Sequence, residues 1–318
     1  MATILERFSL AGRTALVTGG GQGIGQALAH GLAEAGADVA ILDVNEETAC
    51  AVAAEIAALG RRSLALRTDV TVRSEVEAAI EAILADWGRL DIGVNNAGIG
   101  GWADAEAMTE EDWDRVVAVN LRGVFLCAQA EGRAMLAQGY GKIINTASMS
   151  ARIVNRPQNQ VAYNASKAGV VQMTRMLAAE WGRYNINVNC ISPSYVLSPM
   201  HASTPTVVRE RIRQLTPLGH VERPEDLYGA VIFLASAASD YVTGHDLTVD
   251  GGHTLNAWLA PLDRVVPPRV SPAEETVQLK HDLDTLGFPY DADGFNPDVH
   301  PEIAEAFKAA FGTEEPEK

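Results

Sequence analysis

The chain has 318 residues, a formal net charge of −16 and a pI near 4.8, and 47% of its residues are hydrophobic. Such a composition can bury a large core and excludes a disordered chain, while the acidic balance without Lys/Arg clusters argues against binding to nucleic acid or to a membrane surface. No uncharged apolar run reaches the roughly 18 residues of a membrane span, and residues 1–8 lack the apolar core of a signal peptide. Cys50, Cys127 and Cys190 show no disulfide or metal-site spacing, so we expect a metal-free protein of the reducing cytoplasm.

Short apolar runs alternate with longer segments of helical character along most of the chain. We expect strands over residues 14–18, 38–43, 63–68, 90–95, 142–147, 186–192 and 246–250, and helices over residues 23–35, 46–59, 73–87, 110–137 and 161–184. Near-continuous apolar strands that alternate with helices predict a parallel sheet covered on both faces. With right-handed crossovers this is a Rossmann-type, doubly wound α/β fold with a seven-stranded sheet.

The strand and helix pattern stops at Gly251–Gly252, so we expect one domain over residues 1–252 and a separate extension over residues 253–318. The extension holds 13 Asp/Glu, five Lys/Arg and eight of the 14 prolines, which is a weak basis for an independent core. Its aromatic residues are nevertheless too many for a solvated tail: they include Phe288, Tyr290, Phe295, Phe307 and Phe311. We therefore expect an acidic, Pro-rich arm that packs on the body or on a neighbouring subunit.

Residues 18–25 read TGGGQGIG, directly after the first expected strand and at the start of the first expected helix. Glycines at 19, 23 and 25 permit a tight turn and a close approach of the backbone to a pyrophosphate, and the helix N-terminus offers free N–H groups and the positive end of its dipole. The context predicts a dinucleotide-binding loop. The alternative is a glycine-rich turn without a ligand.

Asp43 ends the second expected strand, 18 residues after Gly25. A carboxylate there accepts hydrogen bonds from the adenosine ribose and repels a 2′-phosphate. Gln22, Asn45 and Glu46 offer no positive charge to neutralise such a phosphate. The sequence therefore favours NAD over NADP, the alternative being an exposed Asp at a strand end.

Tyr163 and Lys167 lie four residues apart in an expected helix and so share one face. A tyrosine with a pKa near ~10 needs a neighbouring ammonium to act as a base at neutral pH. Ser148 follows the fifth expected strand, where its hydroxyl can orient an alcohol or carbonyl oxygen, and Asn120 lies in mid-helix, where Asn has a mediocre propensity. Taken singly, Tyr163 and Lys167 could be a pair on a helix surface, Ser148 a turn residue and Asn120 a tolerated polar residue. Together, and in this order, the four residues favour an active site.

With these residues in place, residues 7–252 resemble the short-chain dehydrogenase/reductase family. Further matching segments are Asp69-Val70, NNAG at 95–98, NCISPSYVLSPM at 189–200, and Thr243-Gly with Asp250-Gly-Gly. The resemblance implies catalysis by Asn120, Ser148, Tyr163 and Lys167, with Asn120 holding a water of the proton relay, and it implies a homotetramer. The expected cofactor-binding residues are Gly19, Gln22, Gly23, Ile24, Gly25, Asp43, Asp69, Val70, Asn96, Ala97, Gly98, Tyr163, Lys167, Pro193, Val196 and Ser198. Ser194 departs from the family, which usually has Gly there.

Residues 148–169 resemble the polyol dehydrogenase and ketose reductase branch of the family, through the run Ile-Val-Asn-x-Pro-Gln at 153–158. A polyol needs many hydrogen-bond partners, and unpaired amides would reject an apolar analogue. The expected substrate-binding residues are Ser148, Asn155, Gln158 and Tyr195. The alternative is that the amides satisfy loop backbone, and Arg152 is either a sugar-phosphate ligand or a solvated charge.

We therefore expect an NAD-dependent oxidoreductase that interconverts a small-molecule secondary alcohol, most simply a polyol, and its ketone. One alternative is a reductase of acyl or ring ketones of the 3-oxoacyl or steroid type, which Asp43 disfavours in its NADPH-linked forms. Another is a catalytically silent nicotinamide-binding scaffold, because a fold does not determine a function. The four intact catalytic residues argue against the scaffold.

Overall fold

The structure is a computed structural model that describes residues 3–155, 158–201 and 204–255. The expected arm lies outside the described residues except for its first three, His253–Leu255, which form a short 3₁₀ turn.

Seven parallel strands form one sheet in the order β3-β2-β1-β4-β5-β6-β7. The sequence order reverses between β1 and β4, where Thr18 and Asn95 lie opposite each other at the carboxyl ends of the two strands. In such sheets this switch point opens the crevice in which ligands bind. The strands are β1 (Thr14–Thr18), β2 (Asp38–Asp43), β3 (Ser63–Arg67), β4 (Ile92–Asn95), β5 (Gly141–Thr146), β6 (Ile186–Pro193) and β7 (Asp246–Val249).

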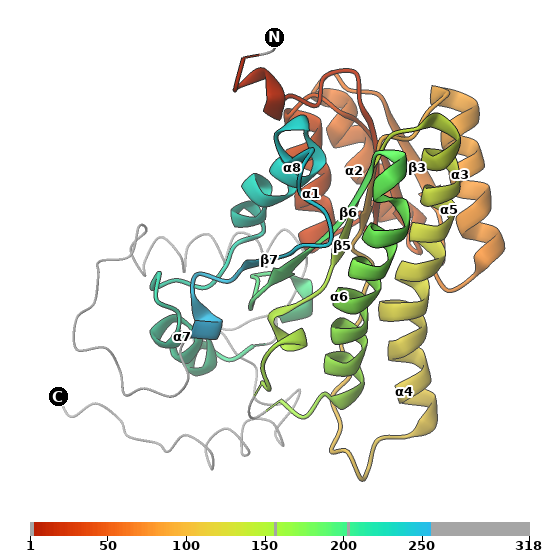
Figure 1. Ribbon diagram of the computed structural model, residues 1–318. Helices are drawn as coiled ribbons and strands as arrows, with labels where there is room; N and C mark the ends of the chain where they lie inside the picture. The colour runs from red at the N-terminus through yellow and green to blue at the C-terminus, as the bar shows by residue number, and fades with distance from the viewer. Residues whose placement is uncertain (1–2, 156–157, 202–203, 256–318) are drawn as a thin grey trace.

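Helices cover both faces of the sheet (Figure 1). On one face α1, α2 and α8 bury side chains such as Leu32, Ile56 and Leu234, and on the other α3, α5 and α6 bury side chains such as Ile83 and Leu177. The expected doubly wound fold is thereby confirmed. The helices are α1 (Gly23–Glu34), α2 (Glu46–Ala58), α3 (Arg73–Trp87), α4 (Glu110–Val117), α5 (Val124–Gln138), α6 (Val161–Trp181), α7 (Thr206–Leu215) and α8 (Tyr228–Ala235).

The expected single helix over residues 110–137 is interrupted. A π-helical turn, Ala118–Gly123, separates α4 from α5 and carries Asn120. A π-helical turn rotates the residues that follow it around the helix axis and needs no proline. The amino-acid composition therefore gives no sign of the interruption. Two short helices, α7 and α8, lie in a region for which the sequence analysis proposed no element.

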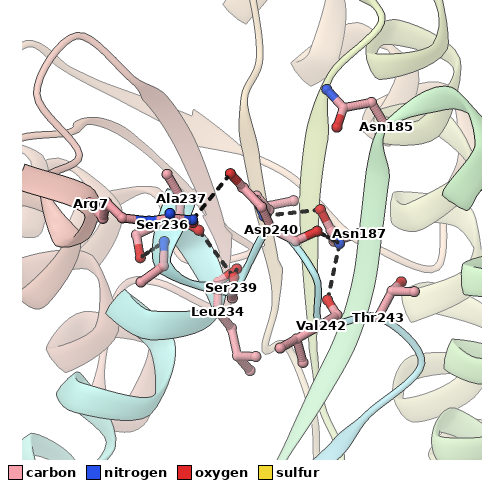
Figure 2. A network of polar contacts seen from close by, with 12 residues as sticks. Arg7, Asn185, Asn187, Leu234, Ser236, Ala237, Ser239, Asp240, Val242 and Thr243 are labelled. Atoms are coloured by element: carbon pink, nitrogen blue, oxygen red, sulfur yellow. Dashed lines mark hydrogen bonds and ion pairs between the residues drawn. The ribbon is translucent and has the colours of Figure 1, made fainter. Parts of the chain in front are cut away.

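A polar network fastens the amino ends of β5 and β6, at the far end of the sheet from the crevice. The buried Lys142 donates to Asn187 Oδ1 and to Asp240 Oδ1, each at 2.9 Å. Figure 2 shows the neighbouring contacts, in which the Asn187 amide donates to the carbonyl of Asp240 at 3.1 Å and Arg7 donates to the carbonyl of Ala237 at 2.7 Å. These bonds stabilise the amino ends of the strands, and the crevice lies at the opposite, carboxyl ends.

Candidate active site

Two adjoining cavities lie at the carboxyl ends of the strands. The larger has a volume of about 630 Å³ and extends from the 18–25 loop to the end of β6; the smaller has a volume of about 200 Å³. Ser148, Tyr163, Ser194 and Met200 line both. A molecule in one cavity therefore meets a molecule in the other across these four side chains.

The phosphate loop can be built only from glycine at two positions. Gly19 has a φ of +61°, a left-handed conformation that glycine adopts without strain. A Cβ at Gly25 would collide with the carbonyl oxygen of Gly19 and lie 2.7 Å from Asn96 Nδ2. That amide donates to the carbonyls of Thr18 and Gly19 at 3.2 and 3.3 Å, which fixes the loop against the floor of the larger cavity. Because α1 begins at Gly23, the loop and the helix N-terminus form a cradle that fits the pyrophosphate of a dinucleotide.

Two carboxylates are held in place in the larger cavity. Asp43 accepts from the backbone N–H groups of Gly21 and Asn45, each at 3.0 Å. Asp69 accepts from the N–H and the hydroxyl of Thr71 at 2.8 and 2.7 Å. Fixed acceptors of this kind suit ribose hydroxyls and an adenine amino group better than a phosphate. Among the described residues, the cations that line this cavity are Arg115 and Lys167.

Tyr163 and Lys167 both lie on α6 near the end of β5, where Lys167 is buried and Tyr163 is half-buried. Lys167 Nζ donates to the carbonyl of Thr146 at 2.7 Å and lies 5.6 Å from the centroid of the Tyr163 ring. Burial lowers the pKa of Lys167 to about 8. Burial also raises the pKa of Tyr163, while a hydrogen bond with Ser148 acts in the opposite direction. The two groups are thus close to each other, and Tyr163 lines both cavities, where acid–base chemistry at an oxygen atom can take place.

Ser148 lies two residues beyond β5, at the start of the 3₁₀ turn Met149–Ala151. Its Oγ accepts from the N–H of Ser150 at 3.1 Å, which leaves the hydroxyl proton for another acceptor. Since Ser148 and Tyr163 line both cavities, two hydroxyl groups converge at their junction.

Asn120 is buried and lines neither cavity. Its Oδ1 accepts from the N–H of Ile99, and its Nδ2 donates to the carbonyl of Ile99, both at 2.8 Å. The π-helical turn therefore points this amide at the backbone that follows Gly98. Its expected part in a proton relay stays a prediction.

The smaller cavity has a polar wall of linked side chains. Asn155 donates to the hydroxyl of Tyr195 at 3.1 Å, and that hydroxyl donates to Gln158 at 3.0 Å. Gln160 donates to Asn155 Oδ1 at 3.2 Å. These bonds join side chain to side chain, so the amides do more than satisfy loop backbone. Trp102, 56% exposed, stands at the rim.

Every expected cofactor-binding residue lines the larger cavity, and all four expected substrate residues line the smaller one. Arg152 instead pairs with the buried Asp246 at 2.8 Å and lines neither. Sequence reasoning missed Gly100 and Gly101, which line the smaller cavity and which the glycine-rich run after NNAG could have indicated. Sequence reasoning also missed Glu222, whose carboxyl accepts from the N–H of Ser194 at 2.6 Å, because no motif near position 222 indicates this contact.

A doubly wound sheet whose carboxyl edge carries a glycine cradle and the hydroxyls of Ser148 and Tyr163 is typical of dinucleotide-dependent oxidoreductases, and comparison with known proteins identifies the family. Residues 19–254 match a family profile described as enoyl-(acyl carrier protein) reductase. Galactitol 2-dehydrogenase of Rhizobium johnstonii is 44% identical over 257 residues, covering 78% of this chain and 98% of that protein. D-threitol dehydrogenase of Mycolicibacterium smegmatis is 41% identical over 249 residues, covering 78% and 95%.

Comparison with solved structures indicates the same class of protein. A short-chain type dehydrogenase/reductase from Mycobacterium marinum superposes with a TM-score of 0.76 at 41% identity, covering 80% of this chain and all of that one. A gluconate 5-dehydrogenase from Burkholderia cenocepacia, in complex with NADP and tartrate, gives a TM-score of 0.77 at 41% identity, with the same coverage.

The chain belongs to the short-chain dehydrogenase/reductase family. It is an oxidoreductase of alcohols and ketones that uses a nicotinamide cofactor, which confirms the expected family and reaction. In the described part of the chain, no helix combines the length and apolar character needed to cross a bilayer.

Proposed function

We propose that the protein interconverts an acyclic polyol and its ketose with NAD. The observation that carries the proposal is the polar wall of Asn155, Tyr195 and Gln158 beside the hydroxyls of Ser148 and Tyr163. A substrate with several adjacent hydroxyls can exchange hydrogen bonds with this wall, whereas an apolar alcohol offers it neither donors nor acceptors. The names of the galactitol and threitol dehydrogenases support the same substrate class.

In the proposed mechanism, Ser148 donates a hydrogen bond to the reacting oxygen and holds it at the junction of the cavities. Tyr163, as phenolate, takes the hydroxyl proton, and the ammonium of Lys167 stabilises that phenolate. The bound nicotinamide supplies the hydride acceptor. In the reverse direction Tyr163 returns the proton to the carbonyl oxygen.

NAD is the proposed cofactor because Asp43 occupies the end of β2 with its carboxylate fixed by two backbone donors. A 2′-phosphate there would meet a negative charge. The relatives use both cofactors: a glycerol dehydrogenase of Listeria innocua is named NAD-dependent and a probable mannitol dehydrogenase of Yarrowia lipolytica NADP-dependent. The preference of this chain therefore rests on Asp43.

The test is NADH formation with a panel of alditols of three to six carbons, compared with simple secondary alcohols. We expect turnover of alditols and a raised KM in Asn155→Ala, with Asn159→Ala as the control because Asn159 bonds Asp104 and lines neither cavity. Turnover of apolar alcohols without turnover of alditols would overturn the polyol assignment. NADPH-linked reduction of a 3-oxoacyl or ring ketone would favour the other enzyme class.

We further propose that residues 253–318 form an arm that packs on the body of the protein or on a neighbouring subunit, in a cytoplasmic homotetramer. Support comes from His253, whose ring meets that of Tyr195 edge-on with centroids 5.5 Å apart and whose Nδ1 lies 3.0 Å from Thr216 Oγ1. The arm thus begins beside a substrate-cavity residue. Truncation after Leu255 should raise the KM for the polyol or change the assembly mass; unchanged kinetics and mass would refute the arm.

A further inference from the structure

Glu222 holds one loop at two points. This buried residue, 6% exposed, precedes the short 3₁₀ turn Pro224–Leu227 and forms a parallel bridge with Val196. Its side-chain Oε2 accepts from the N–H of Ser194 at 2.6 Å, and its backbone carbonyl accepts from the N–H of Leu197 at 2.8 Å. One residue therefore fixes the beginning and the end of the segment 194–197.

The segment that Glu222 holds forms part of the wall of both cavities. Ser194 lines both, Tyr195 lines the smaller one, and Val196 lines the larger one. A shift of this segment would alter the dinucleotide site and the polar wall at the same time. The Glu222 carboxyl itself lines neither cavity, so it acts only through the loop.

The surroundings of the carboxyl favour its neutral form. Oε1 is buried and has no hydrogen-bond partner among the described residues. Asp226, from the 3₁₀ turn, and Asp250, after β7, add negative charge, with His220 beside the first and His253 beside the second. Burial is the main cause that raises the pKa of Glu222 to about 8; the two aspartates act in the same direction, and hydrogen bonds from the backbone and side chain of Ser194 act against them.

We propose that Glu222 is a positioning residue of the hydride-transfer site, which clamps the loop 194–197 between the dinucleotide and the alcohol. The inference rests on the proposed function for the identity of the alcohol, and on the family alone for the dinucleotide. A carboxylate accepts a hydrogen bond from an N–H group more strongly than a neutral acid does, so ionisation of Glu222 strengthens the bond from Ser194 and tightens the clamp. As the pH rises through the titration of Glu222, dinucleotide affinity should therefore be retained better than in a protein whose residue 222 cannot ionise.

The test measures NADH affinity by fluorescence titration from about pH 6 to about pH 9.5 in the wild type, Glu222→Gln and Glu222→Ala. Gln keeps the acceptor for Ser194 and cannot ionise, whereas Ala removes the clamp. The matched control is Glu225→Ala, an exposed carboxyl three residues along the same segment. Lys167 titrates in the same range, and the comparison with Glu222→Gln separates it, because both proteins retain that lysine.

We expect the wild type to lose NADH affinity at high pH by a smaller factor than Glu222→Gln, and Glu222→Ala to bind roughly two- to tenfold more weakly than Glu225→Ala at neutral pH, as for one lost hydrogen bond. Parallel pH profiles of the wild type and Glu222→Gln would overturn the proposal, even if Glu222→Ala fails to fold. Because NADH binding needs no substrate, absence of polyol turnover would refute the proposed function and leave this result standing.

Discussion

The ammonium nitrogen of Lys167 lies 5.6 Å from the centroid of the Tyr163 ring and is fixed there by a 2.7 Å hydrogen bond to the carbonyl of Thr146. Thr146 is the last residue of β5, so the sheet positions the lysine and α6 positions the tyrosine. The end of a strand and the face of a helix thus jointly place a positive charge beside a half-buried phenol. The proposed proton transfer depends on this arrangement.

Replacing Tyr163 with Phe should lower kcat by about 10²–10⁴-fold, because it removes the general base and keeps the ring. NADH affinity should stay close to that of the wild type, since the ring still fills the wall between the cavities. Steady-state kinetics and fluorescence titration measure the two quantities, and Tyr241→Phe, at a fully exposed tyrosine, is the control. A Tyr163→Phe protein with wild-type turnover would exclude the mechanism.

Replacing Lys167 with Met should move the acidic limb of the alcohol-oxidation pH profile to higher pH. The lysine is positively charged below its pKa of about 8 and favours the phenolate of Tyr163, so its loss leaves burial to raise the pKa of that phenol unopposed by charge. Lys167→Arg, which keeps the charge, should show a smaller shift. The profile of kcat against pH measures the effect, and a limb at the same pH in Lys167→Met would contradict it.

Two parts of the site could be predicted from the spacing of residues that are close together in the sequence. The four-residue spacing of Tyr163 and Lys167 determines a shared helix face wherever a helix forms, and the strand–glycine–helix order of residues 18–25 determines the cradle. Both predictions depend only on residues that lie within about one helical turn or one tight loop of each other. The structure places them as the spacing requires.

Features that depend on contacts between residues far apart in the chain could not be predicted from the sequence. The π-helical turn at Asn120 is stabilised by the Ile99 backbone, 21 residues away, and hydrophobic periodicity cannot show it. The eight apolar residues of α8 carry no period that separates a short helix from a buried strand. Glu222 reaches Ser194 across 28 residues of chain, a pairing that only the folded loop reveals.

Replacing Asp43 with Ser should weaken NAD binding by about 10- to 100-fold, the range expected when hydrogen bonds to a charged acceptor are lost. Loss of the negative charge should also improve NADP relative to NAD. Asp43→Asn is the matched control because it can still accept from the N–H of Gly21 and so preserves the phosphate loop. The ratio of kcat/KM for the two cofactors is the measurement, and unchanged NAD kinetics in Asp43→Ser would refute the ribose contact.

Replacing Glu131 with Gln should make folding stability less dependent on pH. Glu131 is fully buried on α5; its Oε2 accepts from Asn95 at 3.0 Å, and its Oε1 has no partner among the described residues. Burial raises the pKa of this carboxyl from 4.5 to about 8. The folded protein therefore holds the proton more tightly than the unfolded chain, so the stabilisation is complete below the unfolded pKa and is lost as the pH rises through the folded value.

Between about pH 5 and about pH 9 this loss is on the order of 4 kcal/mol. Glu131→Gln keeps the shape and the acceptor for Asn95 and cannot ionise, so its free energy of unfolding should decline less over the same range. Urea denaturation at a series of pH values measures the difference, with Glu81→Gln at an exposed carboxyl on α3 as the control. If the wild type and Glu131→Gln lose stability in parallel while Glu81→Gln matches both, the carboxyl is already ionised in the fold and the neutral assignment is wrong.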